Sequence, residues 1–180
     1  MAMDEAVLRQ TWALDPARDA DWDALYADQL PRIYNFFRWR VGDGAVAEDL
    51  TSRTFEKAWV ARERYRRDLA GFGTWLVVIA RNVATDHWRT RRTHAPLDAA
   101  ADVPAGATPE ELAERRSDFE RLSRLLAALD DRERELVALK YGADMTNRAI
   151  AKATGLTESN VGTILHRTIQ ALRDGWQERN

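Results

Sequence analysis

Cysteine is absent from the 180-residue chain, and histidine occurs only three times. The absence of cysteine excludes disulfides, thiolate catalysis, thiol redox sensing and every cysteine-based zinc site. The histidines, His87, His94 and His166, are scattered along the sequence and have no close partner. We therefore expect a protein that holds no metal and no other cofactor.

Long apolar runs are also missing. No run approaches the roughly 18 residues that a membrane-spanning helix needs, and the acidic N-terminus lacks the basic and apolar regions of a secretion signal. The sequence has no nucleophile–base pair and no glycine-rich phosphate loop. We expect a soluble, cytoplasmic protein that makes no membrane contact of its own and is not an enzyme. Because 45% of its residues are hydrophobic, it can bury a core.

The net charge of −2 conceals blocks of opposite sign. Residues 1–30 carry two arginines and seven acids, and residues 98–120 carry the same numbers. By contrast, residues 62–94 carry eight arginines and three acids, and residues 147–180 carry five basic residues and three acids. Basic surfaces are therefore expected on two separate segments, which is where binding to nucleic acid would concentrate.

Apolar residues recur at helical spacing, and no convincing strand alternation occurs. After an acidic leader, the first half of the chain predicts three helices, over 22–41, 45–62 and 74–92. Pro31 is expected to kink or restart the first of these helices. Gly42 and Gly44 are expected to end it. Short connections between long helices predict one compact helical bundle.

The second half begins with residues 93–108, a run of Ala, Asp, Pro and Gly without periodicity that is typical of a linker. Thr108, Pro109 and Glu111 then predict a capped helix start, and the helix should reach about Ala128. Further helix starts are predicted at three capping residues, Asp130, Thr146 and Thr157. The predicted fold is all-α, with two small helical domains joined by a flexible linker.

The segment 146–173 has the spacing of a helix-turn-helix, with a short helix, a turn at Gly155 and a longer helix. Ile150, Leu156, Val161 and Leu165 would form the core of this hinge. The first turns of the second helix carry small polar residues that could read base edges: Glu158, Ser159, Asn160 and Thr163. Phosphate contacts are predicted for Arg148, Lys152 and Arg167. An ordinary helical hairpin with capped ends has the same spacing.

The expected helix 74–92 combines arginine with tryptophan. Guanidinium groups on phosphates and indole rings on unstacked bases are the means by which proteins bind single strands. The candidate residues are Trp75, Asn82, Asp86, Arg89, Arg91 and Arg92. Tryptophans at helical spacing, including Trp88, also fit a bundle core.

Several runs of sequence together resemble a known family. They are Ala47-Glu48-Asp49-Leu50 with Thr54 to Trp59, Phe72 to Leu76 with Ile79-Ala80-Arg81-Asn82, Leu129 to Arg134, and Ile150-Ala151 to Arg173. The first two resemble region 2 of bacterial RNA polymerase sigma factors, and the last two resemble region 4. The resemblance is closest to the extracytoplasmic-function (ECF) group, and it covers about Trp22 to Arg173. It implies a leader at 1–21, region 2 at 22–93, a linker at 94–116 and region 4 at 117–177.

The resemblance implies particular roles for region 2. Its second helix would dock on the clamp helices of core RNA polymerase through Asp49, Ser52, Arg53 and Glu56, with Leu50, Phe55 and Trp59 in the core. Its third helix would hold the −10 element as a single strand. Asn82 would line a pocket for a flipped base, with Asp86 and Arg89 beside it. Residues 91–97 would form the loop that selects the base.

Region 4 would read the −35 duplex and contact the polymerase flap. The implied function is that of an alternative sigma factor, which binds core polymerase, recognises the −10 and −35 promoter elements and helps to melt the DNA. The resemblance also implies an anti-sigma factor as a partner. A net acidic chain should bind free DNA weakly, and docking on polymerase would make its DNA contacts effectively intramolecular.

Three alternatives remain open at the level of sequence. A stand-alone helix-turn-helix regulator would bind duplex DNA tightly without docking on polymerase, which the modest positive charge of 147–180 disfavours. A helical hydrolase could use Glu48, Asp49 and Asp86, although no metal-ligand spacing supports it. A structural adaptor would tolerate the loss of Asn82 and Asn160.

Overall fold

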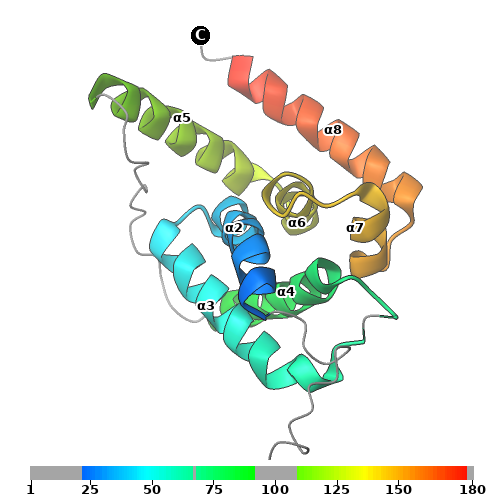
Figure 1. The fold of residues 1–180 in the computed structure, drawn as a ribbon. Helices are drawn as coiled ribbons and strands as arrows, with labels where there is room; N and C mark the ends of the chain where they lie inside the picture. The colour runs from blue at the N-terminus through cyan, green and yellow to red at the C-terminus, as the bar shows by residue number, and fades with distance from the viewer. Residues whose placement is uncertain (1–21, 67, 92–108, 178–180) are drawn as a thin grey trace, which may run out of the picture.

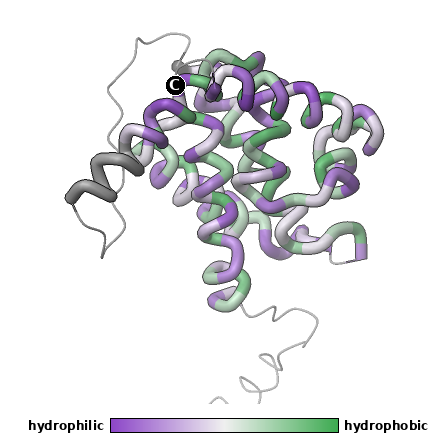
Figure 2. The backbone as a smooth tube through the Cα atoms, turned by 90° about the horizontal axis from the view of Figure 1, so that it is seen from above, coloured by the Kyte–Doolittle hydropathy of each residue, from purple (hydrophilic) through white to green (hydrophobic). Residues whose placement is uncertain are grey.

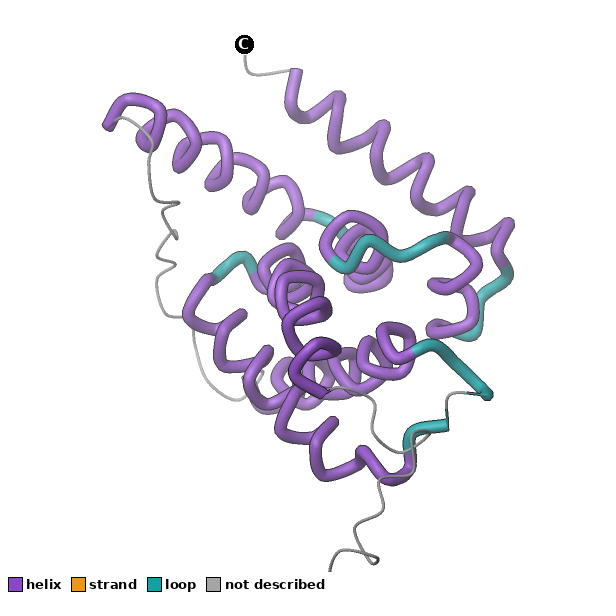
Figure 3. The backbone as a smooth tube through the Cα atoms, viewed as in Figure 1, coloured by secondary structure: helices purple, strands orange, loops and turns teal. Residues whose placement is uncertain are grey.

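The computed structural model describes residues 22–66, 68–91 and 109–177. All regular structure in these three segments is helical, and none of them contains a strand (Figure 3). The expected all-α class is therefore confirmed. The helices form two units along the chain, and the second unit lies directly against the first (Figure 1).

The first unit contains α2 (Trp22–Val41), α3 (Gly44–Ala61), the short 3-10 turn η1 (Arg62–Arg64) and α4 (Phe72–Arg91). α2 continues without interruption through Pro31, so the expected restart does not occur. Pro31 and Ala27 are both exposed. The carbonyl of Ala27, which loses its usual partner at proline, can therefore bind water instead.

The turn between α2 and α3 differs by one residue from the prediction. Gly42 has φ +77° and ends α2, as expected of glycine in the left-handed region. Asp43 is the N-cap of α3, and its Oδ1 accepts a hydrogen bond of 2.8 Å from the amide of Val46. Gly44 is thus the first residue of α3, and the prediction that it ends α2 is wrong. The capping carboxylate starts the new helix immediately.

The second unit contains α5 (Pro109–Ala128), α6 (Asp131–Val137), the π-helical segment η2 (Ala138–Gly142), α7 (Asn147–Thr154) and α8 (Glu158–Gln177). All three predicted caps are confirmed. Side-chain oxygens of Asp130, Thr146 and Thr157 accept hydrogen bonds from the amides three residues later, at 2.8, 3.2 and 3.2 Å. These caps fix where α6, α7 and α8 begin.

Arg134 joins α5 to α6. Its guanidinium donates hydrogen bonds to the carbonyls of Leu126, Ala127 and Leu129, at 2.8, 2.7 and 2.9 Å. These carbonyls lie at the end of α5 and in the residue that follows it, where the intrahelical hydrogen bonds run out. The carbonyl of Leu126 also accepts a 3.2 Å hydrogen bond from the amide of Leu129. Burial lowers the pKa of Arg134, and the nearby positive charge of Arg40 lowers it further. The group stays charged at neutral pH, because an arginine pKa lies far above 7.

The core is continuous through both units. Ile33, Phe36 and Phe37 of α2 are completely buried, and α2 packs against α3 and α4 on one side and η2 and α6 on the other. Each such side chain contributes roughly 1.5–3 kcal/mol when fully buried. Figure 2 shows hydrophobic and hydrophilic residues alternating along the helices, as amphipathic helices around a shared core require.

Val78 and Trp59 lie at the surface, although the resemblance placed Trp59 in the core. Val78 is 38% exposed, because the buried face of α4 runs through Leu76, Ala80 and Val83 and leaves Val78 on the opposite side. Trp59 is 53% exposed. Its ring and that of Trp22 form an edge-to-face pair with centroids 5.7 Å apart, and the guanidinium of Arg62 lies 4.2 Å from the Trp59 ring centroid.

Replacing either of two buried threonines by valine should change the free energy of unfolding, in opposite directions for the two positions. Thr168 Oγ1 has no hydrogen-bond partner among the described residues, whereas Thr54 Oγ1 donates a 2.7 Å bond to the carbonyl of Leu50. Thr168→Val should raise the free energy of unfolding by about 1 kcal/mol, because it removes an unsatisfied buried hydroxyl. Thr54→Val should lower it by about 0.5–1 kcal/mol. Urea denaturation followed by circular dichroism measures both, and shifts of the same sign would contradict the assignment.

Candidate nucleic-acid interface

The helix-turn-helix expected at 146–173 is present as α7, a tight turn and α8. Ile150, Val161 and Leu165 are buried between the two helices, and Leu156 packs against them. Gly155 has φ +74° and caps α7 through a bond from its amide to the carbonyl of Ala151. A left-handed residue at this position turns the chain sharply, so only three residues separate the end of α7 from the start of α8.

The beginning of α8 is open to solvent. Four residues proposed to read bases, Glu158, Ser159, Asn160 and Thr163, are all exposed. Thr163 Oγ1 donates to the carbonyl of Ser159 at 3.0 Å, and the hydroxyl oxygen can still accept a further bond. The geometry therefore allows this turn of α8 to enter a major groove, which is wide enough for a helix.

The three basic residues of the helix-turn-helix lie in different settings. Arg148 and Arg167 are exposed. Lys152 is exposed too, but its Nζ donates a 2.5 Å hydrogen bond to the carbonyl of Leu69, in the connection that precedes α4. In this arrangement Lys152 is therefore bound to the first unit, and the sequence pattern gave no indication of that contact.

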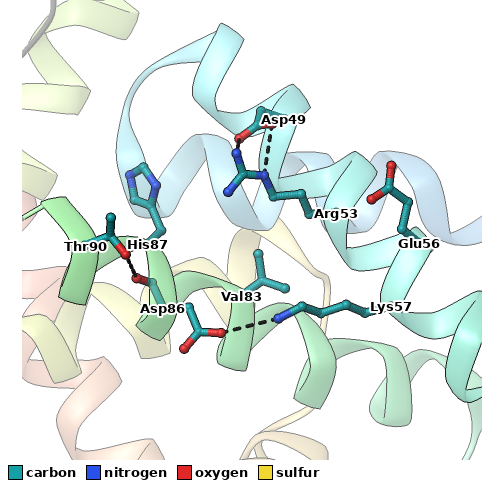
Figure 4. Close-up of a pocket in the computed structure, with 8 residues that line it drawn as sticks. All are labelled: Asp49, Arg53, Glu56, Lys57, Val83, Asp86, His87 and Thr90. Carbon is teal, nitrogen blue, oxygen red and sulfur yellow. Dashed lines mark hydrogen bonds and ion pairs between the residues drawn. The ribbon is translucent and has the colours of Figure 1, made fainter.

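A second candidate surface lies between α3 and α4. It surrounds an open cavity of about 470 Å³ (Figure 4). The side chains that line it are Asp49, Arg53, Glu56 and Lys57 from α3 and Val83, Asp86, His87 and Thr90 from α4. Three of the four residues predicted to bind polymerase thus share one cavity with Asp86, which was predicted to lie beside the −10 pocket.

Ion pairs connect the walls of this cavity. Arg53 binds Asp49 within α3, with Nε–Oδ1 and Nη2–Oδ2 distances of 3.1 and 3.0 Å. Lys57 Nζ reaches across to Asp86 Oδ2 at 3.3 Å, and Arg89 Nη2 lies 3.2 Å from Asp86 Oδ1. All five side chains are at least half exposed, so each pair contributes well under about 1 kcal/mol. A partner can therefore rearrange them at little cost.

Sequence reasoning missed Lys57. Its position four residues after Arg53 places both on the same side of α3. That spacing could have suggested Lys57 as part of the surface, but only the packing of α3 on α4 reveals that Asp86 is its partner.

The residues proposed for the −10 element form a stripe on α4. Trp75, Asn82, Asp86 and Arg89 lie seven, four and three residues apart, which places them on one side of a helix. Asn82 is exposed. Trp75 is partly buried against Tyr65 and Phe72, with ring centroids 5.1 and 5.5 Å away.

The remaining candidates lie at the edges of these surfaces. Ser52 is exposed on α3 beside Asp49 and Arg53. Arg91 is the last residue of α4, and Arg92 lies outside the described residues. Within the described segments, no cluster of histidine and acidic side chains could hold a metal ion. No helix within those segments is long and apolar enough to cross a membrane.

Comparison with known proteins gives two matches to family profiles and several relatives. Residues 25–94 match Sigma-70 region 2, and residues 119–172 match Sigma-70 region 4. The chain is 30% identical over 179 residues to the ECF RNA polymerase sigma factor BldN of Streptomyces coelicolor, covering 95% of this chain and 67% of that protein. It is 33% identical over 163 residues to the RNA polymerase sigma factor CarQ of Myxococcus xanthus, covering 89% and 91%.

The fold is also shared with a solved structure. The sigma factor RpoE of Bartonella quintana, crystallised with the anti-sigma factor NepR, superimposes with a TM-score of 0.72 at 19% identity, covering 90% of this chain and 100% of that one. The two family matches, in this order along the chain, define a two-part helical protein of transcription initiation. The chain belongs to the sigma-70 family of RNA polymerase sigma factors, within its ECF group. Members of this family are non-enzymatic initiation factors, and the matches favour this function over a stand-alone regulator.

Two glycines in open surroundings test the turn of the helix-turn-helix. A Cβ at Gly155 or at Gly71 would meet no atom within 4 Å, but only Gly155 has a positive φ. Gly155→Ala should therefore lower the free energy of unfolding by roughly 1–2 kcal/mol, which is the cost of a left-handed alanine. Gly71→Ala should leave it unchanged or raise it slightly. Chemical denaturation of both variants measures this. Equal losses of unfolding free energy in the two variants would mean that the positive φ of Gly155 does not cause the destabilisation.

Proposed function

We propose that this ECF sigma factor acts through the two surfaces described above and carries out no chemistry of its own. Region 2, over 22–93, would bind core polymerase and the −10 element. Region 4, over 117–177, would bind the −35 element and the polymerase flap. The connecting part, 94–116, includes the first turns of α5. The protein would work in the cytoplasm, where RNA polymerase and promoter DNA are found.

The main support is the shared cavity between α3 and α4. Asp49, Arg53 and Glu56 on one wall face Asp86 on the other, and Lys57 connects the walls (Figure 4). A polymerase surface that binds the α3 wall would compete with Asp49 for Arg53 and with Asp86 for Lys57. Docking would then change the charge around Asp86, which belongs to the α4 stripe proposed for single-stranded DNA. Polymerase binding and capture of the −10 strand are thereby coupled.

Capture of the −10 strand would use the α4 stripe. Flipping a base out of the duplex costs a few kcal/mol, which contacts with the unpaired base must offset. Asn82 offers both a donor and an acceptor for the edge of that base. Trp75 offers part of an aromatic face, and stacking of a base on such a ring is worth roughly 1–3 kcal/mol.

Recognition of the −35 duplex would use the first turns of α8. Asn160 is exposed there and could make a bidentate contact to adenine. Arg148 and Arg167 would contact phosphates on either side and set the register. Few cations are available for this, so affinity for free DNA should be low and should fall with salt. Docking on polymerase supplies the missing affinity.

An anti-sigma factor is the further partner that we propose. The Bartonella quintana RpoE structure contains such a partner, NepR. A protein of this kind would inhibit the chain by covering the surfaces that polymerase and DNA require.

Association with core polymerase tests the proposal directly. The purified chain should co-migrate with bacterial core RNA polymerase on gel filtration in moderate salt without DNA. The double variant Asp49→Lys, Glu56→Lys should lose most of this association, because it reverses two charges on the α3 wall. Elution of the wild-type chain alone, together with binding to duplex DNA, would support the stand-alone regulator instead.

A matched control for this experiment is Glu48→Lys. Glu48 is exposed on α3 next to Asp49, but it points about 100° further around the helix and does not line the cavity. The Glu48→Lys variant should co-migrate with polymerase as the wild-type chain does. Equal losses for Glu48→Lys and the double variant would indicate a general charge effect and not a docking surface.

Asn82→Ala separates DNA melting from polymerase binding. It should reduce promoter opening by about tenfold, corresponding to one lost polar contact of roughly 1–3 kcal/mol, and leave co-migration intact. Permanganate reactivity of unpaired thymines measures the opening. Thr85→Ala, at an exposed position one turn further along α4, is the control and should open promoters normally. If Asn82→Ala lost promoter opening and co-migration to the same extent, the substitution would be impairing the fold and not a DNA contact.

A further inference from the structure

Gly162 is a glycine at a position where the helix itself does not need one. It is the fifth residue of α8, inside a regular helix, and its φ is not positive. Glycine within a helix is less stable than alanine, because it loses more backbone freedom on folding and packs no side chain. The reason for a glycine here must therefore lie outside α8.

Close packing supplies such a reason at three other helical glycines. A Cβ on Gly142 would lie 2.8 Å from a backbone carbonyl oxygen of α2. A Cβ on Gly73 would lie 2.7 Å from Oε1 of Gln29, and one on Gly175 would lie 3.0 Å from Cδ2 of Leu125. All three distances are shorter than the roughly 3.5–4.0 Å at which carbon atoms pack. At these positions a neighbour occupies the space that a methyl group would need.

No neighbour fills that space at Gly162. Apart from the backbone of its own helix, the one atom of the described residues that a Cβ there would meet is Nδ2 of Asn147, at 3.6 Å. This is an ordinary van der Waals distance, so alanine would fit. Room for one methyl group is left open beside Gly162, and we call this space the α8 gap.

The α8 gap lies among the residues proposed to read bases. At 100° per residue, Gly162 is about 40° around the helix from Glu158 and about 60° from Ser159. Glu158 and Ser159 are exposed and Gly162 is partly exposed, whereas Val161 and Leu165 are buried. The gap is therefore on the part of α8 that is available to a partner.

Asn147 forms the other side of the α8 gap. It is the first residue of α7, which packs against α8. Its Oδ1 is buried and has no hydrogen-bond partner among the described residues, which costs stability. Gly162 and Asn147 thus both reduce stability at one place. Residues that do so are expected where a protein binds something, because function and stability compete there.

The chemistry of the α8 gap fits one edge of one base. Its floor is the Cα of Gly162, which offers an apolar contact, and the neighbouring carboxylate of Glu158 repels a phosphate. Among the groups that base pairs present in the major groove, the C5 methyl of thymine is the apolar one, and the O4 acceptor of the same base lies next to it. The open space has the size of a methyl group, and Asn147 Nδ2 is a donor beside it.

We propose that the α8 gap reads one thymine of the −35 duplex: the methyl group of that thymine fills the space beside Gly162, and Asn147 Nδ2 donates to its O4. The proposal rests on the proposed function, which brings the beginning of α8 into the major groove of that duplex. Gly162 is then a specificity-determining residue through the side chain that it lacks, and α7 contributes to base recognition through Asn147.

Removing the methyl group from the DNA tests the proposal with the protein unchanged. The probe is the duplex that the complex of the chain with core polymerase selects from a pool randomised over the −35 segment. Each thymine of that segment is replaced in turn by deoxyuridine, which lacks only the C5 methyl group. At one position this should lower the affinity of the complex roughly three- to fivefold, as expected for one buried methyl group. Unchanged affinity at every position would overturn the proposal.

Gly162→Ala is the converse test, and Gly175→Ala, about 20 Å further along α8, is the matched control. The new methyl group of Gly162→Ala should fill the gap, lower affinity for the thymine duplex roughly tenfold and abolish the effect of deoxyuridine at that position. The same variant should unfold at a higher urea concentration, because alanine is the better helix former. Gly175→Ala should bind both duplexes as the wild type does. A Gly162→Ala variant that still prefers thymine would contradict the proposal.

Two asparagine variants separate this proposal from the proposed function. Asn147→Ala keeps the gap but removes the donor, so it should weaken binding roughly three- to tenfold and remain sensitive to deoxyuridine. If Asn160→Ala weakens binding to the selected duplex but Gly162→Ala does not, the −35 surface stands and the α8 gap is not part of it. If the complex selects no sequence from the pool, the proposed role of region 4 fails, and the reading of thymine fails with it.

Discussion

The packing of α2 against both halves of the chain is the contact on which the rest of the structure depends. Ile33, Phe36 and Phe37 are completely buried there. On one side they fix α3 and α4, which carry the proposed polymerase and −10 surfaces. On the other side α2 receives η2 and α6, which support the helix-turn-helix. One helix therefore determines both the shape of the first unit and the position of the second, because closely packed interiors transmit displacements between neighbouring elements.

Electrostatics follows from the same arrangement. Residues 62–94 are the most basic part of the chain, yet one of their arginines, Arg81, faces Glu135 of the second unit. Lys152 of the second unit is likewise bound to the first. Part of the positive charge that the sequence presents for nucleic acid is thus neutralised within the molecule. Ion pairs that are a quarter exposed or less are screened weakly by salt, whereas the exposed pairs around the α3–α4 cavity rearrange easily.

Sequence patterns predicted local structure well and long-range packing poorly. Caps at Asp130, Thr146 and Thr157 could be recognised because each acts within three residues of itself. Motif spacing was sufficient to indicate the family. The exposure of Trp59 could not be predicted, because helical periodicity shows which residues share a face but not how far a neighbouring helix covers it. The contact between the two units escaped prediction because the close approach of Gly142 to the backbone of Asn35 and Phe36 joins residues that are far apart in the sequence.

Arg134 gives the second unit a mechanical property. Its guanidinium, on α6, bonds the carbonyls of Leu126, Ala127 and Leu129 and so ties the end of α5 to α6. α5 has 20 residues and is about 30 Å long, and its far end is where the chain from region 2 arrives. A rotation of about 10° at Arg134 would move that end by roughly 5 Å over such a length. A small change of angle at the Arg134 junction is therefore enlarged along α5 before it reaches the point where the chain from region 2 arrives.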